Sequence, residues 1–218
     1  MTWTWWALSA LGAGHGLNPG MGWLFAVALG MQEKKSRAVW RALPPLALGH
    51  ALAVGAAALL AAALGQILPA DALKYIVGVS LLTLGGVRLV RHRHPRYGGM
   101  RVGFRELTTW SFLMATAHGA GLMVLPLLVG RGGSEAIAVH AGHGTYTTYA
   151  TLLPISGLMD ASLWATLVHT AGYLSVTGLI AVIVYRKFGL RLLRTMWINL
   201  DLIWGGALLM TGALTIIL

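Results

Sequence analysis

Long apolar runs with few charged residues dominate the chain. Apolar residues make up 57% of its 218 residues and charged residues only 10%, whereas about 25% of the residues are charged in an ordinary soluble domain. A soluble fold of this composition would have too little polar surface to cover its core. The sequence therefore predicts an integral membrane protein whose apolar helices cross the bilayer, and it argues against a soluble enzyme.

Six of these runs are long enough for a helix to cross about 30 Å of hydrocarbon, which takes roughly 20 residues. We therefore expect an all-α membrane protein with six transmembrane helices. The first run contains Asn18-Pro19-Gly20, and because Pro removes a helical hydrogen-bond donor, we expect this helix to be broken there. The runs cover residues 3–30, 43–68, 72–90, 107–130, 160–185 and 196–217.

Basic residues lie in alternate connections between these runs. Of the 16 Lys and Arg residues, 14 fall in the first, third and fifth connections when Arg88, at the end of the third run, is counted with the third connection. Because positive residues mark the cytoplasmic side, six spans predict both termini outside, in the plasma (inner) membrane. Arginines beside a bilayer attract anionic lipid head groups. The net charge of +10 is thereby explained without a nucleic-acid partner.

The chain reads as one membrane domain, 1–218, made of two halves. The halves, 1–90 and 107–218, are joined by a basic cytoplasmic loop at 91–106. Halves of three spans each insert in opposite senses, so similarity between them indicates an inverted-topology repeat. We therefore expect a 3+3 inverted repeat.

Histidines occupy matching places in the two halves. His15 in GAGHGLNPGM corresponds to His118 in ATAHGAGLMVLP, and His50 in LGHALAVGAAALLA corresponds to His169 in LVHTAGYLSVTGLIA. Each half thus contributes one histidine from its first helix and one from its second. All four are expected at hydrocarbon depth, where an ionisable residue normally faces a partner or a wet cavity.

The chemistry of these four residues favours a cation path at the bilayer midplane. Neutral imidazole is a ligand for zinc, nickel, cobalt or copper and is also the form that is cheapest to bury. The alternative is that each imidazole bonds only to a neighbouring carbonyl. We therefore predict a transition-metal ion as the transported cation, with tentative ligands His15, His50, His118 and His169.

The break in the first run adds two candidate groups. Pro19 cannot donate to the carbonyl of His15, so we expect that oxygen to be free. Asn18 is expected either to supply an oxygen ligand or to orient an imidazole. Broken helices at the midplane are where transporters place their substrate and ion sites, so Asn18 and Pro19 join the predicted path.

Two further features are weaker. Asp201 is the one carboxylate well inside a run, where it would balance a cation or carry protons, unless it pairs locally with Arg194 or Asn199. His140 and His143 are three residues apart in an outside connection. That spacing puts both on one helical face, where they would collect a metal before entry.

The six-span, three-plus-three pattern, the H-G-x-N-P motif from His15 to Pro19 and the L-G-H that ends at His50 resemble the lysine exporter superfamily, whose nickel and cobalt efflux branch is most similar. The resemblance implies a secondary exporter and no enzymatic activity. Asn18 stands where the metal-exporting branch often has an acidic residue, and the chain has no long His-rich loop. An amino acid or another small solute is therefore the alternative substrate.

Two other functional classes would use the same residues. Paired histidines on facing helices could ligate haem noncovalently, as in a b-type haem protein. A membrane metallohydrolase that uses Asp160 or Asp201 would lack a compact motif such as H-E-x-x-H. The chain has no cysteine, which excludes thiolate sites. No resident cofactor is assigned, and the expected partners are the bilayer, anionic lipid, the transported solute and a second copy in a homo-oligomer.

Overall fold

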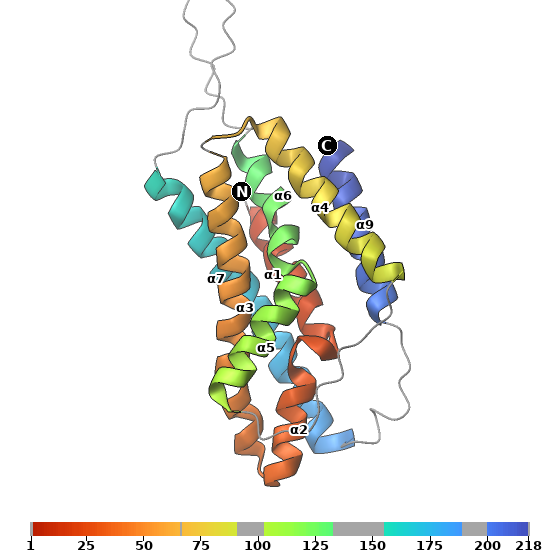
Figure 1. The fold of residues 1–218 in the computed structure, drawn as a ribbon. Coiled ribbons are helices and arrows are strands. Elements are labelled where there is room, and N and C mark those ends of the chain that lie inside the picture. Colours follow the sequence, from red (N-terminus) through yellow and green to blue (C-terminus); the bar gives the residue numbers. More distant parts are fainter. Residues whose placement is uncertain (1, 66, 91–102, 133–154, 189–199, 218) are drawn as a thin grey trace, which may run out of the picture.

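A computed structural model describes residues 2–65, 67–90, 103–132, 155–188 and 200–217 (Figure 1). Every regular element in these ranges is helical, which confirms the all-α prediction. The elements are α1 (Thr2–Leu17), η1 (Pro19–Met21), α2 (Trp23–Glu33), α3 (Ser36–Leu64), α4 (Ala70–Val90), α5 (Phe104–Ala117), α6 (Ala120–Gly132), α7 (Ile155–Ile183), the π-helical turn η2 (Val184–Phe188) and α9 (Leu200–Ile217).

Within the described ranges, three helices are long and apolar enough to cross a membrane. These helices comprise Ser36–Leu64, Asp71–Val90 and Met159–Phe188. The pair α5 and α6 is bent by 57° and counts as a fourth candidate if it forms one span. The described part of the chain is therefore all helical, with three or four helices of membrane-spanning length. Helices α1, α2 and α9 are each too short to be counted in the same way.

The predicted break in the first run is present. Helix α1 ends at Leu17, and the 3-10 turn η1 begins with Pro19, whose missing N–H is tolerated at the first position of a helix. Gly22 follows with a φ of 143°, which residues with a Cβ rarely adopt. The backbone can then restart as α2 at Trp23.

A second break divides the fourth run, and it was not predicted. Helix α5 ends at Ala117, His118 caps it, and Gly119 has a φ of 70° before α6 starts at Ala120. This left-handed conformation costs glycine little and other residues about 1 to 2 kcal/mol. The alignment of His118-Gly119 with His15-Gly16 was the one sequence signal that could have indicated it.

Close helix crossings hold the molecule together. Helix α1 packs along α7, α3 packs against both α5 and α7, and α4 pairs with α9 (Figure 1). A Cβ at Gly12 would overlap the carbonyl oxygen of His169, and one at Gly49 would overlap that of Thr108. Small residues of this kind let membrane helices approach until their backbones touch.

The α4–α9 pair forms its own layer beside the other helices. Gly78 approaches Gly212, and Gly85 approaches Gly205. Figure 1 shows that the pair ends well short of the lower ends of α3 and α7. The last turn of α4, which carries Arg88, therefore lies beside the middle of the other helices.

Candidate functional site

Three of the four predicted histidines meet in the interior. The ring centroids of His15 and His50 are 5.8 Å apart, those of His15 and His169 are 5.2 Å apart, and those of His50 and His169 are 5.3 Å apart. The three side chains come from α1, α3 and α7, and all are fully buried. We call these three residues the histidine cluster.

Hydrogen bonds fix the proton position on two of the rings. Nδ1 of His15 donates to the carbonyl of Leu11 at 2.9 Å, and Nδ1 of His169 donates to the carbonyl of Leu8 at 3.2 Å. In the neutral form, each Nε2 is therefore an acceptor with a free lone pair. Backbone carbonyls orient metal-binding histidines in the same way.

Unpartnered polar atoms are concentrated in this cluster. Among the described residues, Nε2 of His15, Nε2 of His169 and both ring nitrogens of His50 are buried without a hydrogen-bond partner. A buried acceptor or donor left in this state costs about 1 to 3 kcal/mol. Such groups normally find a ligand, an ion or an ordered water.

Two aromatic side chains enclose the cluster, and sequence reasoning identified neither. The ring of Tyr173 lies nearly parallel to that of His50 at 4.0 Å, and Trp204 lies 4.6 Å from His15. Tyr173 is one helical turn beyond His169, so its place on the same face was readable from the spacing. Trp204 carried no comparable signal.

The hydroxyl of Tyr173 also ties the cluster to the first break. It donates to the carbonyl of Met21 at 2.6 Å, and both residues are buried. The indole Nε1 of Trp23 donates to the carbonyl of Leu17, the last residue of α1, at 3.0 Å. Side chains thus satisfy carbonyls that the broken helix leaves without an intrahelical partner.

One expectation about this break is wrong. The carbonyl of His15 is not free, because the backbone N–H of Asn18 donates to it at 3.2 Å. In a continuous α-helix, the N–H of residue 19 would donate to this carbonyl, but Pro19 has no N–H. In the tighter turn, the N–H of Asn18 donates to it instead. The side-chain oxygen of Asn18 accepts from the N–H of Gly20 at 2.9 Å and caps η1. Its buried Nδ2 has no hydrogen-bond partner among the described residues, and the role of Asn18 in the path stays a prediction.

The fourth histidine, His118, has a different partner. Its Nδ1 donates to the carbonyl of Met114 at 2.8 Å, while Nη1 of Arg88 lies 3.0 Å from its Nε2. Arg88 also donates through Nε and Nη2 to the carbonyl of Ala117, at 3.2 and 2.9 Å. Arg88 was expected in the basic connection. Instead it belongs to α4 and reaches the end of α5 because α4 stops beside that break.

The remaining predicted residues cannot be placed in the site. The backbone of Asp201 belongs to α9, but its side chain lies outside the part of the chain that is described. His140 and His143 lie in 133–154, which also falls outside the described residues. The predictions for these three residues stay as they were.

The cluster as it stands is not arranged around a metal ion. In the described ranges, no three His, Asp or Glu side chains could hold one ion together. The rings of His50 and His169 are inclined by only 8° and are stacked. The lone pairs of stacked rings lie in parallel planes, so they do not meet at one point. His50 would have to turn before the three rings could share an ion.

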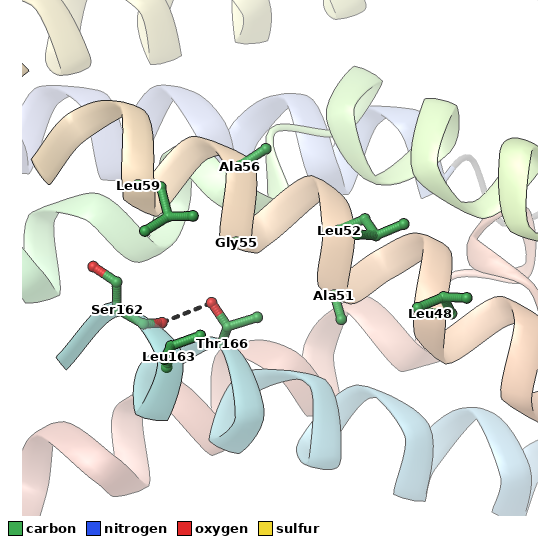
Figure 2. Close-up of a pocket in the computed structure, with 9 residues that line it drawn as sticks. All are labelled: Leu48, Ala51, Leu52, Gly55, Ala56, Leu59, Ser162, Leu163 and Thr166. Atoms are coloured by element: carbon green, nitrogen blue, oxygen red, sulfur yellow. Dashed lines mark hydrogen bonds between the residues drawn. The ribbon is translucent and has the colours of Figure 1, made fainter. Parts of the chain in front are cut away.

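An apolar groove of about 290 Å³ lies between α3 and α7 (Figure 2). Its polar lining residues are Ser162 and Thr166, and the Thr166 hydroxyl donates to the Ser162 carbonyl at 2.8 Å. The other lining residues are Leu, Ala and Gly. None of the predicted site residues lines this groove, so its chemistry differs from that of the histidine cluster.

Comparison of the chain with protein-family models, with curated proteins and with solved structures finds no match in any of the three. The function proposed below therefore rests on the chemistry of the histidine cluster.

Proposed function

We propose that the chain is a six-span secondary transporter of the plasma (inner) membrane that exports a small cation, a transition-metal ion, through the histidine cluster. The observation that carries this proposal is the concentration, on three buried rings from three helices, of four imidazole nitrogens that have no partner in the described part of the chain. Neutral imidazole is the ligand that such ions take. An intramembrane group of this kind normally marks a transport path.

The proposed spans are α1 with α2, α3, α4, α5 with α6, α7, and α9. In this scheme, the first and fourth spans are broken helices, which supports a pairing of the halves. The packing supports it too, since α1 lies along α7 while α5 lies along α3. His50 and His169 stand at corresponding points of α3 and α7, which are both 29 residues long.

The α4–α9 crossing has the symmetry that an inverted repeat requires. Exchange of the halves equates Gly78 with Gly205 and Gly85 with Gly212, because both pairs are separated by the same interval. The observed contacts join Gly78 to Gly212 and Gly85 to Gly205. The exchange therefore converts each contact into the other, as a two-fold axis between the repeats would.

Binding of the cation requires one local change in the cluster. His15 and His169 already present a free Nε2, with the proton held at Nδ1 by a carbonyl. His50 is stacked on Tyr173, and neither of its nitrogens has a hydrogen bond among the described residues to oppose rotation. We propose that His50 turns about its side-chain torsions to complete the site.

Transport in proteoliposomes loaded with Co²⁺ tests this proposal. Replacement of two cluster members, H15A with H169A, is expected to abolish Co²⁺ flux, because a single imidazole cannot hold the ion. H92A, in the basic connection, is the matched control and should transport at the wild-type rate. Wild-type flux in the double variant would overturn the proposal.

The alternatives predict different readouts. Export of an amino acid would appear as counterflow of radiolabelled lysine that is unaffected by Co²⁺. A b-type haem protein would show a Soret band after purification from haem-sufficient cells. The packing does not favour haem, since a porphyrin would have to stand between rings that are 5.2 to 5.8 Å apart and walled by Tyr173 and Trp204.

A further inference from the structure

We propose that three buried hydroxyl groups beside the histidine cluster form a separate site for a small monovalent cation, Na⁺. They belong to Ser111 of α5 and to Tyr173 and Thr177 of α7, and all three residues are buried. The hydroxyls of Ser111 and Thr177 lie close to that of Tyr173. We call these three residues the hydroxyl cluster. The site goes beyond the proposed function and does not depend on it.

Two of these hydroxyls direct their hydrogen atoms at backbone carbonyls. Tyr173 donates to the carbonyl of Met21, and Ser111 donates to the carbonyl of Leu46, each at 2.6 Å. The lone pairs of both hydroxyl oxygens are therefore left to accept, and the carbonyl oxygen of Met21 has a second lone pair. Oxygens whose hydrogens are already used attract a cation and repel an anion.

Thr177 lacks the hydrogen bond that other threonines of the chain make. The hydroxyls of Thr166 and Thr211 each donate to the carbonyl four residues earlier at 2.8 Å, which is a common arrangement in membrane helices. Thr177 is fully buried, and its Oγ1 has no hydrogen-bond partner among the described residues. Leaving a buried hydroxyl in this state is unfavourable, so Thr177 indicates a ligand in the hydroxyl cluster.

The backbone of the first break comes close to this cluster. A Cβ at Gly22 would lie 2.9 Å from the Tyr173 hydroxyl, so the absence of one lets the break approach. A Cβ at Gly16, at the end of α1, would lie 3.1 Å from the backbone nitrogen of Thr177. The carbonyls of broken membrane helices are the groups with which transporters coordinate Na⁺.

The chemistry of the oxygens selects the ion. The three hydroxyls and the Met21 carbonyl are all neutral. Hard divalent cations are normally bound through carboxylates, and their second charge would be left unbalanced here, which is costly at membrane depth. Transition-metal ions favour the imidazoles of the histidine cluster. A neutral set of oxygens therefore fits a hard ion with a single charge.

Tyr173 belongs to both sites. Its ring lies on that of His50 at 4.0 Å, while its hydroxyl donates to Met21 in the hydroxyl cluster. Two cations at opposite ends of one tyrosine repel each other. Na⁺ should therefore weaken binding of the exported cation, and the exported cation should weaken binding of Na⁺ by the same factor. This coupling rests on the proposed function, whereas the Na⁺ site does not.

Binding of radiolabelled Na⁺ to the purified full chain, measured by equilibrium dialysis without Co²⁺, tests the site. The wild type should bind Na⁺ saturably. T177V should weaken this binding by about tenfold or more, because valine keeps the shape of threonine and removes the oxygen. T211V, which removes a hydroxyl from α9, is the matched control and should bind as the wild type does. No saturable binding by the wild type, or equal binding by T177V, would overturn the site.

Thermal unfolding in detergent gives a readout that also shows whether T177V folds. NaCl should raise the wild-type unfolding midpoint above that in choline chloride at the same ionic strength, because a ligand of the folded state stabilises it. T177V should be at least as stable as the wild type in choline chloride, since it removes a buried hydroxyl without a partner. It should show no rise in NaCl. A full Na⁺-dependent rise in T177V would contradict the proposal.

Co²⁺ binding in the two salts separates the coupling from the proposed function. The wild-type affinity for Co²⁺ should be about fivefold or more lower in NaCl than in choline chloride, and T177V should show no such difference. Equal wild-type affinities in the two salts would overturn the coupling. No Co²⁺ binding by the wild type in either salt would overturn the proposed function, while saturable Na⁺ binding that T177V weakens would still support the Na⁺ site.

Discussion

The first and fourth runs both break at a glycine of positive φ, but the two breaks are stabilised by different chemistry. At the first break, aromatic donors satisfy the carbonyls, Trp23 on Leu17 and Tyr173 on Met21. At the second, a guanidinium does so, with Arg88 on Ala117. At the first break, Nε2 of His15 has no hydrogen-bond partner among the described residues and His15 belongs to the cluster. At the second break, the guanidinium of Arg88 contacts the ring of His118. The difference shows that two breaks at glycines of positive φ can be stabilised by different side chains and can leave their histidines in different surroundings.

The largest difference in unfolding free energy is expected between alanine substitutions at Gly22 and Gly119, the glycines at the two breaks. G22A should lower the free energy of unfolding by about 3 kcal/mol, because a φ of 143° is rarely adopted by residues with a Cβ and that Cβ would lie 2.9 Å from the Tyr173 hydroxyl. G119A, at a φ of 70°, should cost about 1 to 2 kcal/mol, because the left-handed conformation costs less there and the Cβ would meet the movable end of the Leu208 side chain at 2.9 Å. Thermal unfolding in detergent compares the two, and an equal or larger loss in G119A would contradict the comparison.

Removal of the Tyr173 hydroxyl should have the next largest effect. Y173F keeps the ring on His50 but leaves the buried carbonyl of Met21 without its donor, which should cost about 2 kcal/mol. Y75F, on an exposed tyrosine of α4, is the matched control. Identical unfolding midpoints for Y173F and Y75F would show that this bond does not hold the first break.

A smaller effect is expected from Trp23. W23F removes the donor to Leu17 but retains an aromatic ring, so the cost should be about 1 kcal/mol. The corresponding change at the second break, R88Q, retains a side-chain donor for Ala117 and should be similar or milder. Chemical unfolding of both variants measures this, and a much larger loss in R88Q would mean that charge stabilises the second break.

The smallest loss of stability is expected when the exposed ion pair between Glu33 and Arg41 is removed. The pair joins α2 to α3 away from both breaks, and both side chains are largely exposed. E33Q should therefore cost about 0.5 kcal/mol at low salt and less at high salt. A loss as large as that of Y173F would indicate that this turn, not the break, anchors the first half.

The sequence predicts well what depends on local covalent chemistry. Pro19 lacks an N–H, so the first break was predictable, whereas the break at Gly119 has no such residue and was indicated only by comparison of the halves. The helical class follows in the same way from the uncharged runs. The lengths of the first and sixth spans do not follow from the sequence in this way, because α1, α2 and α9 are shorter than the runs that contain them.

The site was predictable as far as the repeat pattern reached. Matching the halves selected His15, His50 and His169, which the structure brings together, but it also selected His118, which lies on Arg88. Which helix faces which is a property of tertiary packing, so the neighbours Arg88 and Trp204 could not be found from spacing. The free carbonyl expected at His15 failed because a 3-10 turn supplied another donor.

The most direct test of the central claim is the Co²⁺ content of the purified chain after dialysis, compared with that of the triple variant H15A/H50A/H169A. The account predicts a single bound ion per wild-type chain and none in the variant, with both proteins eluting as the same folded species. Equal Co²⁺ content in the two proteins, or none in either, would contradict the assignment of the histidine cluster as a cation site.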